Sequence, residues 1–201
     1  MAKPTTPAET SGPTRRRADA ERSVAAILDA ALEALASDPD SSMSEIARRA
    51  GVVRATVYVH FPTRTALLDA VMEHAVAQVV EAMRGAEPER GEPVEAVERV
   101  LRATWRQLAR FHGLLALNTA RLSAEELHRR HVPMLDQLEP LIERGQTQGV
   151  FRSDLPVAWH LAVIRAIVHA ASHEIQAGRL PEPEAEAAMI GTALAAVGST
   201  S

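Results

Sequence analysis

Apolar residues recur every three or four positions along most of the chain, and no stretch alternates apolar and polar residues as a half-buried β-strand would. The repeat is interrupted by short segments rich in proline, glycine and charge. This pattern predicts an all-α protein of about nine helices, over residues of about 19–36, 43–50, 54–60, 63–83, 94–110, 112–121, 124–147, 156–177 and 183–197.

Residues 42–61 have the pattern of two short helices joined by a tight turn. Ser42 and Glu45 have the spacing of a capping box, in which hydroxyl and carboxylate both bond to amides at a helix start. Gly51 can adopt the left-handed conformation that closes a helix. The segment is therefore predicted to be a helix-turn-helix, whose second helix lies in the major groove of DNA.

The same segment carries the resemblance to a known family. The stretch from Ile46 to Leu68 reads Ile-Ala-Arg-Arg-Ala-Gly-Val-x-x-Ala-Thr-Val-Tyr-x-His-Phe-x-x-Arg-x-x-Leu-Leu, which closely resembles the N-terminal domain of the TetR family of transcriptional regulators over about residues 22–75. The resemblance implies an N-terminal three-helix DNA-binding domain and a C-terminal helical domain for ligand binding and dimerisation. It also implies repression that is relieved when a small molecule binds.

The interruptions of the helical pattern give the domain boundaries. A disordered basic arm is predicted over 1–18, the helix-turn-helix domain over 19–66, a connecting helix and linker over 67–92, and the ligand-binding and dimerisation domain over 93–198. The connecting helix has an apolar stripe wide enough to pack on both domains. Pro133 predicts a break or kink near His131, and Pro140 predicts a second one.

Charge is distributed unevenly along the chain. The formal net charge is −4, which is not the footprint of a uniformly basic DNA-binding protein. Between Ile46 and Leu68, however, there are four arginines and no acid. This concentration of positive charge favours DNA binding by the helix-turn-helix, although a solvated arginine face is the simpler alternative.

Candidate DNA contacts follow from the second helix of the motif. Arg54 can donate two hydrogen bonds to guanine, and Ala55 can touch a thymine methyl group. The resemblance implies further contacts, mostly to phosphate, by Ser44, Thr56, Tyr58, His60 and Arg64. The basic run Arg15, Arg16 and Arg17 either enters an adjacent minor groove or belongs to a solubilising tail.

Two positions depart from the family pattern. Val53 stands where a capping serine is usual, so the second helix loses a hydroxyl cap worth about 1 kcal/mol. Val59 stands where an aromatic or basic residue is frequent, which removes one potential DNA contact. We therefore expect modest DNA affinity unless the arginine arm compensates.

The last two helices predict a homodimer. The helix over 156–177 is apolar on two sides, and the helix over 183–197 adds small residues that allow close approach. Two such helices from each subunit resemble the four-helix dimer interface of the family, the alternative being a larger monomer core. A two-fold dimer presents recognition helices about 34–36 Å apart, which predicts a palindromic double-stranded DNA operator.

A ligand pocket is expected in the second domain, with apolar walls and a few polar anchors. Each apolar candidate could equally be ordinary core. The candidate walls are Trp105, Leu108, Phe111, Leu115, Met134, Leu138, Trp159 and Val163, and the candidate anchors are His112, Asn118, Arg121 and Arg165.

Other functional classes find little support. The chain has no cysteine, and its spaced histidine pairs lack a third ligand, so no metal and no cofactor are predicted. No catalytic motif is present, which leaves an all-helical enzyme as a remote alternative. A DNA-binding regulator without a small-molecule inducer is the closer alternative. No membrane-spanning segment is predicted, and a cytoplasmic location is expected.

Overall fold

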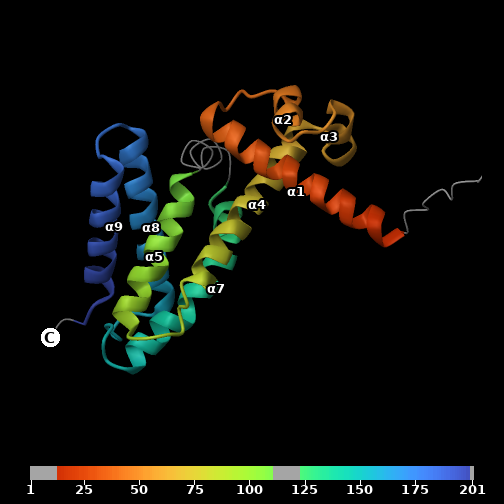
Figure 1. The fold of residues 1–201 in the computed structure, drawn as a ribbon. Helices are drawn as coiled ribbons and strands as arrows, with labels where there is room; N and C mark the ends of the chain where they lie inside the picture. Colours follow the sequence, from red (N-terminus) through yellow and green to blue (C-terminus); the bar gives the residue numbers. More distant parts are fainter. Residues whose placement is uncertain (1–12, 111–122, 200–201) are drawn as a thin grey trace, which may run out of the picture.

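The computed structural model describes residues 13–110 and 123–199, which form eight α-helices and no β-strand apart from one isolated bridge. The helices are α1 (Pro13–Ser37), α2 (Met43–Arg49), α3 (Arg54–His60), α4 (Arg64–Gly85), α5 (Pro93–Ala109), α7 (Ala124–Thr147), α8 (Val157–Gln176) and α9 (Glu182–Val197). In Figure 1, α1 to α3 gather at one end, α5, α7, α8 and α9 form a bundle at the other, and α4 runs between them. None of these helices is long and apolar enough to cross a membrane.

The N-terminal domain folds around one apolar core. Ile27 and Leu35 of α1, Ile46 of α2 and Val57 of α3 are completely or almost completely buried together. Gly51 has φ of +68°, the left-handed conformation predicted for the turn between α2 and α3. The helix-turn-helix predicted from the sequence is therefore present.

Helix α4 belongs to two cores. Its first half contributes Leu67, Val71 and Ala75 to the N-terminal core, and its second half contributes Val79 and Met83 to the C-terminal core. Thr63 caps the helix by accepting a 3.1 Å hydrogen bond from the Ala66 amide. The prediction that α4 packs on both domains is confirmed.

The C-terminal domain is a helical bundle closed by a short return of the chain. Phe151, buried after the end of α7, forms an isolated bridge with Gly198 at the end of α9. The Phe151 ring lies directly against Gly145 of α7, where no side chain would fit. This contact fixes how the chain leaves α7 and enters α8.

Two expectations about helix boundaries are corrected. Helix α1 begins at Pro13, so residues 13–18 of the predicted disordered arm are helical, and residues 1–12 lie outside the described range. Helix α7 is continuous through Pro133 and Pro140, which contradicts a break near His131, while the kink given as the alternative stays a prediction. Both prolines are exposed, so water can bond to the carbonyls that lose their helical partners. The helix expected over 112–121 also lies outside the described residues.

Replacing Gly145 with alanine should destabilise the protein by about 1–3 kcal/mol or more, because the new methyl group would overlap the Phe151 ring. Urea unfolding at fixed protein concentration measures the change. Gly85→Ala is the matched control, since a Cβ there meets no atom within 4 Å. The control should be neutral or slightly stabilising, and equal stability of the two variants would contradict the packing described.

Candidate DNA interface and ligand cavity

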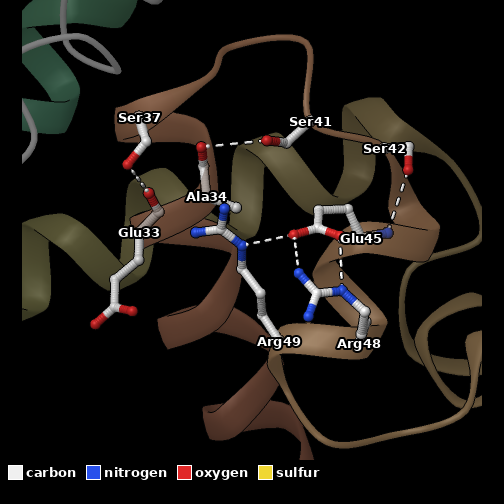
Figure 2. Close-up of polar contacts among 8 residues, drawn as sticks. All are labelled: Glu33, Ala34, Ser37, Ser41, Ser42, Glu45, Arg48 and Arg49. Carbon is white, nitrogen blue, oxygen red and sulfur yellow. Dashed lines mark hydrogen bonds and ion pairs between the residues drawn. The ribbon is translucent and has the colours of Figure 1, made fainter.

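The start of α2 is held by one hydroxyl and one carboxylate with different partners. The Ser42 hydroxyl accepts a 3.2 Å hydrogen bond from the Glu45 amide, as predicted. The Glu45 carboxylate instead accepts bonds from Arg48, at 2.6 and 2.9 Å, and from Arg49, at 2.9 Å (Figure 2). These hydrogen bonds, first from Arg48 and then from Arg49, lower the pKa of Glu45 to about 2. Only the hydroxyl half of the predicted capping box is therefore formed.

Arginines between Ile46 and Leu68 already bond to other groups of the protein, which the sequence did not indicate. Arg48 and Arg49 share the single carboxylate of Glu45, which lies just outside the acid-free stretch. Arg64 donates to the carbonyl oxygen of Ser41 and, at 2.6 Å, to that of Pro39. Its guanidinium thus ties α4 to the loop between α1 and α2, and the DNA contact by Arg64 stays a prediction.

The loop before α2 is also anchored from its own side. The buried Ser41 hydroxyl donates a 3.2 Å hydrogen bond to the carbonyl oxygen of Ala34 in α1, a contact drawn in Figure 2. Together with the Arg64 contacts it fixes where α2 begins relative to α1. Ser44 is exposed on the first turn of α2.

The exposed face of α3 centres on Arg54 and Tyr58. The Arg54 guanidinium lies 5.2 Å from the Tyr58 ring centroid and donates a 3.2 Å hydrogen bond to its hydroxyl group. Ala55 is exposed beside them, whereas Thr56 and His60 are half-buried. This face presents one cation and one phenol to the solvent, which are groups that can bond to base edges and phosphates.

Helix α3 lacks a side-chain cap. Val53 occupies its N-cap position, with extended backbone and no side-chain hydrogen bond, and is 70% exposed. The amides of the first turn of α3 therefore keep no side-chain partner at this position. The departure from the family pattern has the local consequence that the sequence predicted.

The basic run at the start of the chain lies within α1. Arg15, Arg16 and Arg17 all fall in its first turns, and Arg17 pairs with Glu21 at 3.1 Å on the exposed helix surface. Because these three arginines belong to a helix, the segment is not the flexible arm that the sequence predicted.

A cavity of about 450 Å³ lies where α4, α5, α7 and α8 meet. Its walls are mainly aliphatic side chains and methionines. They include Met72, Val76, Val79 and Met83 from α4, Leu101 and Leu108 from α5, Leu127, Met134, Leu135 and Leu138 from α7, and Ile164 and Val168 from α8. This volume is within the range of small-molecule sites.

Two histidines form the polar centre of the cavity. His131 of α7 and His169 of α8 approach within 3.0 Å through their Nε2 atoms. His131 Nδ1 lies 2.6 Å from the Leu127 carbonyl oxygen, which can only accept, so His131 donates through Nδ1. When His131 is neutral, its Nε2 therefore accepts from His169 Nε2.

Burial and like charge keep both imidazoles neutral. Desolvation is the main cause that lowers the pKa of His169 to about 4, followed by the charges of His131 and Arg165. Desolvation likewise lowers the pKa of His131, against a raising effect of its bond to Leu127. The permanent charge beside the pair is the guanidinium of Arg165, one turn before His169.

The predicted ligand-site residues fall into three groups. Met134, Leu138 and Arg165 line the cavity, as does Leu108. Trp105 is 1% exposed within the C-terminal core, Trp159 is 56% exposed at the surface, and Val163 is half-buried. None of these three lines the cavity, which corrects the expectation for them. Phe111, His112, Leu115, Asn118 and Arg121 lie outside the described residues.

Sequence reasoning missed two contributors to the cavity. The first contributor is α4, whose apolar residues were expected only to pack on the two domains. Sequence reasoning also treated His131 and His169 separately, because residues 38 positions apart on two helices carry no signal of pairing. The i, i+4 spacing of Arg165, His169 and His173 did mark one polar face of α8, and all three line the cavity.

The fold and these two sites together define a helix-turn-helix DNA-binding regulator with an internal cavity beside its connecting helix. Comparison with known proteins agrees. Residues 27–71 match the family model of bacterial regulatory proteins of the tetR family, and residues 93–180 match the tetracyclin repressor-like C-terminal domain. The crystal structure of the TetR transcription regulatory protein from Mycobacterium vanbaalenii is 32% identical, with a TM-score of 0.63, over 92% of this chain and 99% of that one. The chain belongs to the TetR family of transcriptional regulators.

A second relative is the HTH-type transcriptional repressor LfrR of Mycolicibacterium smegmatis. It is 43% identical over 79 residues, which cover 39% of this chain and 41% of LfrR. The structure of LfrR in complex with proflavine shares the fold, with 24% identity and a TM-score of 0.66 over 90% of this chain and 99% of that one.

Replacing Val53 with serine should stabilise the protein by about 1 kcal/mol, because the hydroxyl can accept from the first turn of α3 at an N-cap whose backbone is already extended. Urea unfolding measures the gain, and Val53→Ala is the control that lacks the hydroxyl. A serine variant no more stable than the alanine variant would show that the missing cap is not a weakness of α3.

Proposed function

We propose that this protein is a homodimeric repressor that binds a palindromic operator and is released when a small molecule enters the cavity between α4, α5, α7 and α8. The observation that carries the proposal is the position of α4, which lines the cavity and also packs in the core beneath the helix-turn-helix. The protein would act in the cytoplasm, where bacterial operator DNA lies.

In the proposed DNA complex, α3 enters the major groove. Arg54 reads guanine through its two terminal nitrogens after leaving the ring of Tyr58, and Tyr58 then bonds to phosphate. Arg48 and Arg49 sit on the adjacent exposed face of α2, where phosphate could replace Glu45 as their partner. Thr56 and His60 would assist at the edge of the same surface.

The proposed dimer forms through α8 and α9. Trp159, Ala166 and Ala170 are exposed on α8, while Gly191 and Ala195 are exposed on α9. A 56% exposed tryptophan beside a surface of small residues suits close helix packing with a second copy. An isologous interface of this kind would place the two recognition helices about one DNA turn apart.

The proposed release follows from differential binding. A ligand shifts the equilibrium only if it binds the released state more tightly than the DNA-binding state. In this cavity it would contact five side chains of α4 and would therefore respond to the position of that helix. The alternative of a regulator without an inducer leaves a cavity of this size without a role. An enzymatic role has no catalytic group to support it in the described parts of the chain.

The proposal is tested by selecting randomised duplex DNA with the purified full-length protein. We expect a palindromic site from which Arg54→Ala loses about 1–3 kcal/mol of discrimination at one symmetric pair of positions, measured by gel shift at fixed salt. Arg84→Ala, an exposed arginine at the far end of α4, is the control and should discriminate as the natural protein does.

The outcome separates the parts of the proposal. A selected site without dyad symmetry would contradict the dimer. Unchanged discrimination by Arg54→Ala would remove Arg54 as the base reader. Recovery of no preferred site would contradict sequence-specific regulation as a whole.

A further inference from the structure

The charged groups on the cavity wall are of one sign. Among the described residues that line it there is no aspartate or glutamate, and Arg165 is the permanently charged side chain. Within residues 13–110 and 123–199, no carboxylate lies within 4.0 Å of the Arg165 guanidinium. A half-buried guanidinium in an apolar cavity is costly unless an anion accompanies it.

Three acids on the surrounding helices already have partners. Asp69 of α4 and Glu126 of α7 both pair with Arg130, at 3.1 and 3.2 Å. Glu174 of α8 pairs with Arg179 at 2.6 Å. None of these carboxylates is available to neutralise Arg165 without breaking an existing ion pair.

The histidine pair leaves Arg165 as the permanent charge of the described cavity wall. His131 and His169 are neutral and bond to each other, so they add hydrogen-bonding capacity without a second permanent charge. His169 keeps Nδ1 as an acceptor, because its Nε2 donates to His131. The described wall thus offers one permanent positive charge, the His131–His169 pair, the uncharged polar side chains of Thr104, Ser172 and Gln176, the imidazole of His173 and an extended aliphatic surface.

From this arrangement we infer that the effector is an anionic amphiphile, with one acidic group that pairs with Arg165 and an apolar body of drug-like size against the walls from α4 and α7. The inference rests on the proposed function of the cavity as the sensor. It separates this chain from LfrR, whose structure contains proflavine. Proflavine is a planar aromatic cation, and the described wall here holds no carboxylate to pair with it.

A matched pair of fluorescent probes tests the inference on the full-length protein. 8-Anilinonaphthalene-1-sulfonate and N-phenyl-1-naphthylamine share one aromatic skeleton and differ by the sulfonate, and proflavine supplies the cationic case. We expect the sulfonate to bind about 10- to 100-fold more tightly than the neutral amine, the range of hydrogen bonds to charged groups, and proflavine to bind most weakly.

Four variants test whether Arg165 and the cavity cause the preference for the sulfonate probe. Arg165→Gln should abolish it, and Arg165→Lys should retain most of it, which keeps the test informative if the glutamine variant folds poorly. Arg129→Gln removes an exposed arginine that does not line the cavity and should change nothing. Val76→Trp should fill the cavity and weaken every probe, which shows that the probes bind there.

The possible results distinguish this inference from the proposed function. Equal binding of sulfonate and amine, tighter binding of proflavine, or a preference that survives Arg165→Gln would overturn the anionic effector while leaving the cavity as a sensor. Binding of no probe, or binding unaffected by Val76→Trp, would overturn both the anionic effector and the cavity as the ligand site.

Discussion

The sharing of α4 between two hydrophobic cores is the constraint on which the rest of the structure depends. Leu67, Val71 and Ala75 are buried beneath the helix-turn-helix, and Val79 and Met83 are buried in the C-terminal bundle about one to four turns further along. Because packed helices do not deform continuously, a shift of α4 must move one core against the other. The cavity lies at this junction, where neither core fills the space beside α4.

Helix α4 makes polar contacts with helices on both of its sides. On the α1 side, Asp29 accepts a bond from Gln78 at 3.1 Å and lies 2.7 Å from His74, above a well-packed core. On the α7 side, the link at this level is the Asp69–Arg130 pair at 3.1 Å, beside the cavity. A partly exposed ion pair is worth at most about 1 kcal/mol. The polar contacts on both sides are therefore weak, and the apolar packing in the two cores sets the position of α4.

The sequence predicted the elements well where local chemistry determines them. Ser42 begins a helix and Gly51 ends one through local conformation and bonds within a few residues, and both behave as expected. The prediction was incomplete where several partners compete for one group. Glu45 bonds to Arg48 and Arg49 and not to the amide that a capping box requires. Arg64 bonds to carbonyls more than twenty residues away, which local spacing does not indicate.

The wall of the cavity was only partly predictable, because it depends on how helices that are distant in sequence pack together. Arg165 and Met134 could be chosen because polar and flexible side chains on amphipathic helices often line pockets. Trp159 is exposed on α8 and lies outside the cavity wall, because the spacing of apolar residues does not separate an exposed aromatic side chain from one that lines a cavity. The His131–His169 contact depends on the relative rotation of α7 and α8, which hydrophobic spacing does not determine.

The most direct test of coupling between the cavity and the DNA-binding domain is the affinity of a cavity ligand for the free protein and for the protein saturated with its operator. A fluorescence titration with anilinonaphthalene sulfonate gives both dissociation constants. If α4 couples the two sites, operator-bound protein should bind the probe about 5- to 150-fold more weakly, and the probe should weaken operator binding by the same factor. Equal dissociation constants would contradict the coupling, because a ligand that binds both states equally cannot shift the equilibrium between them.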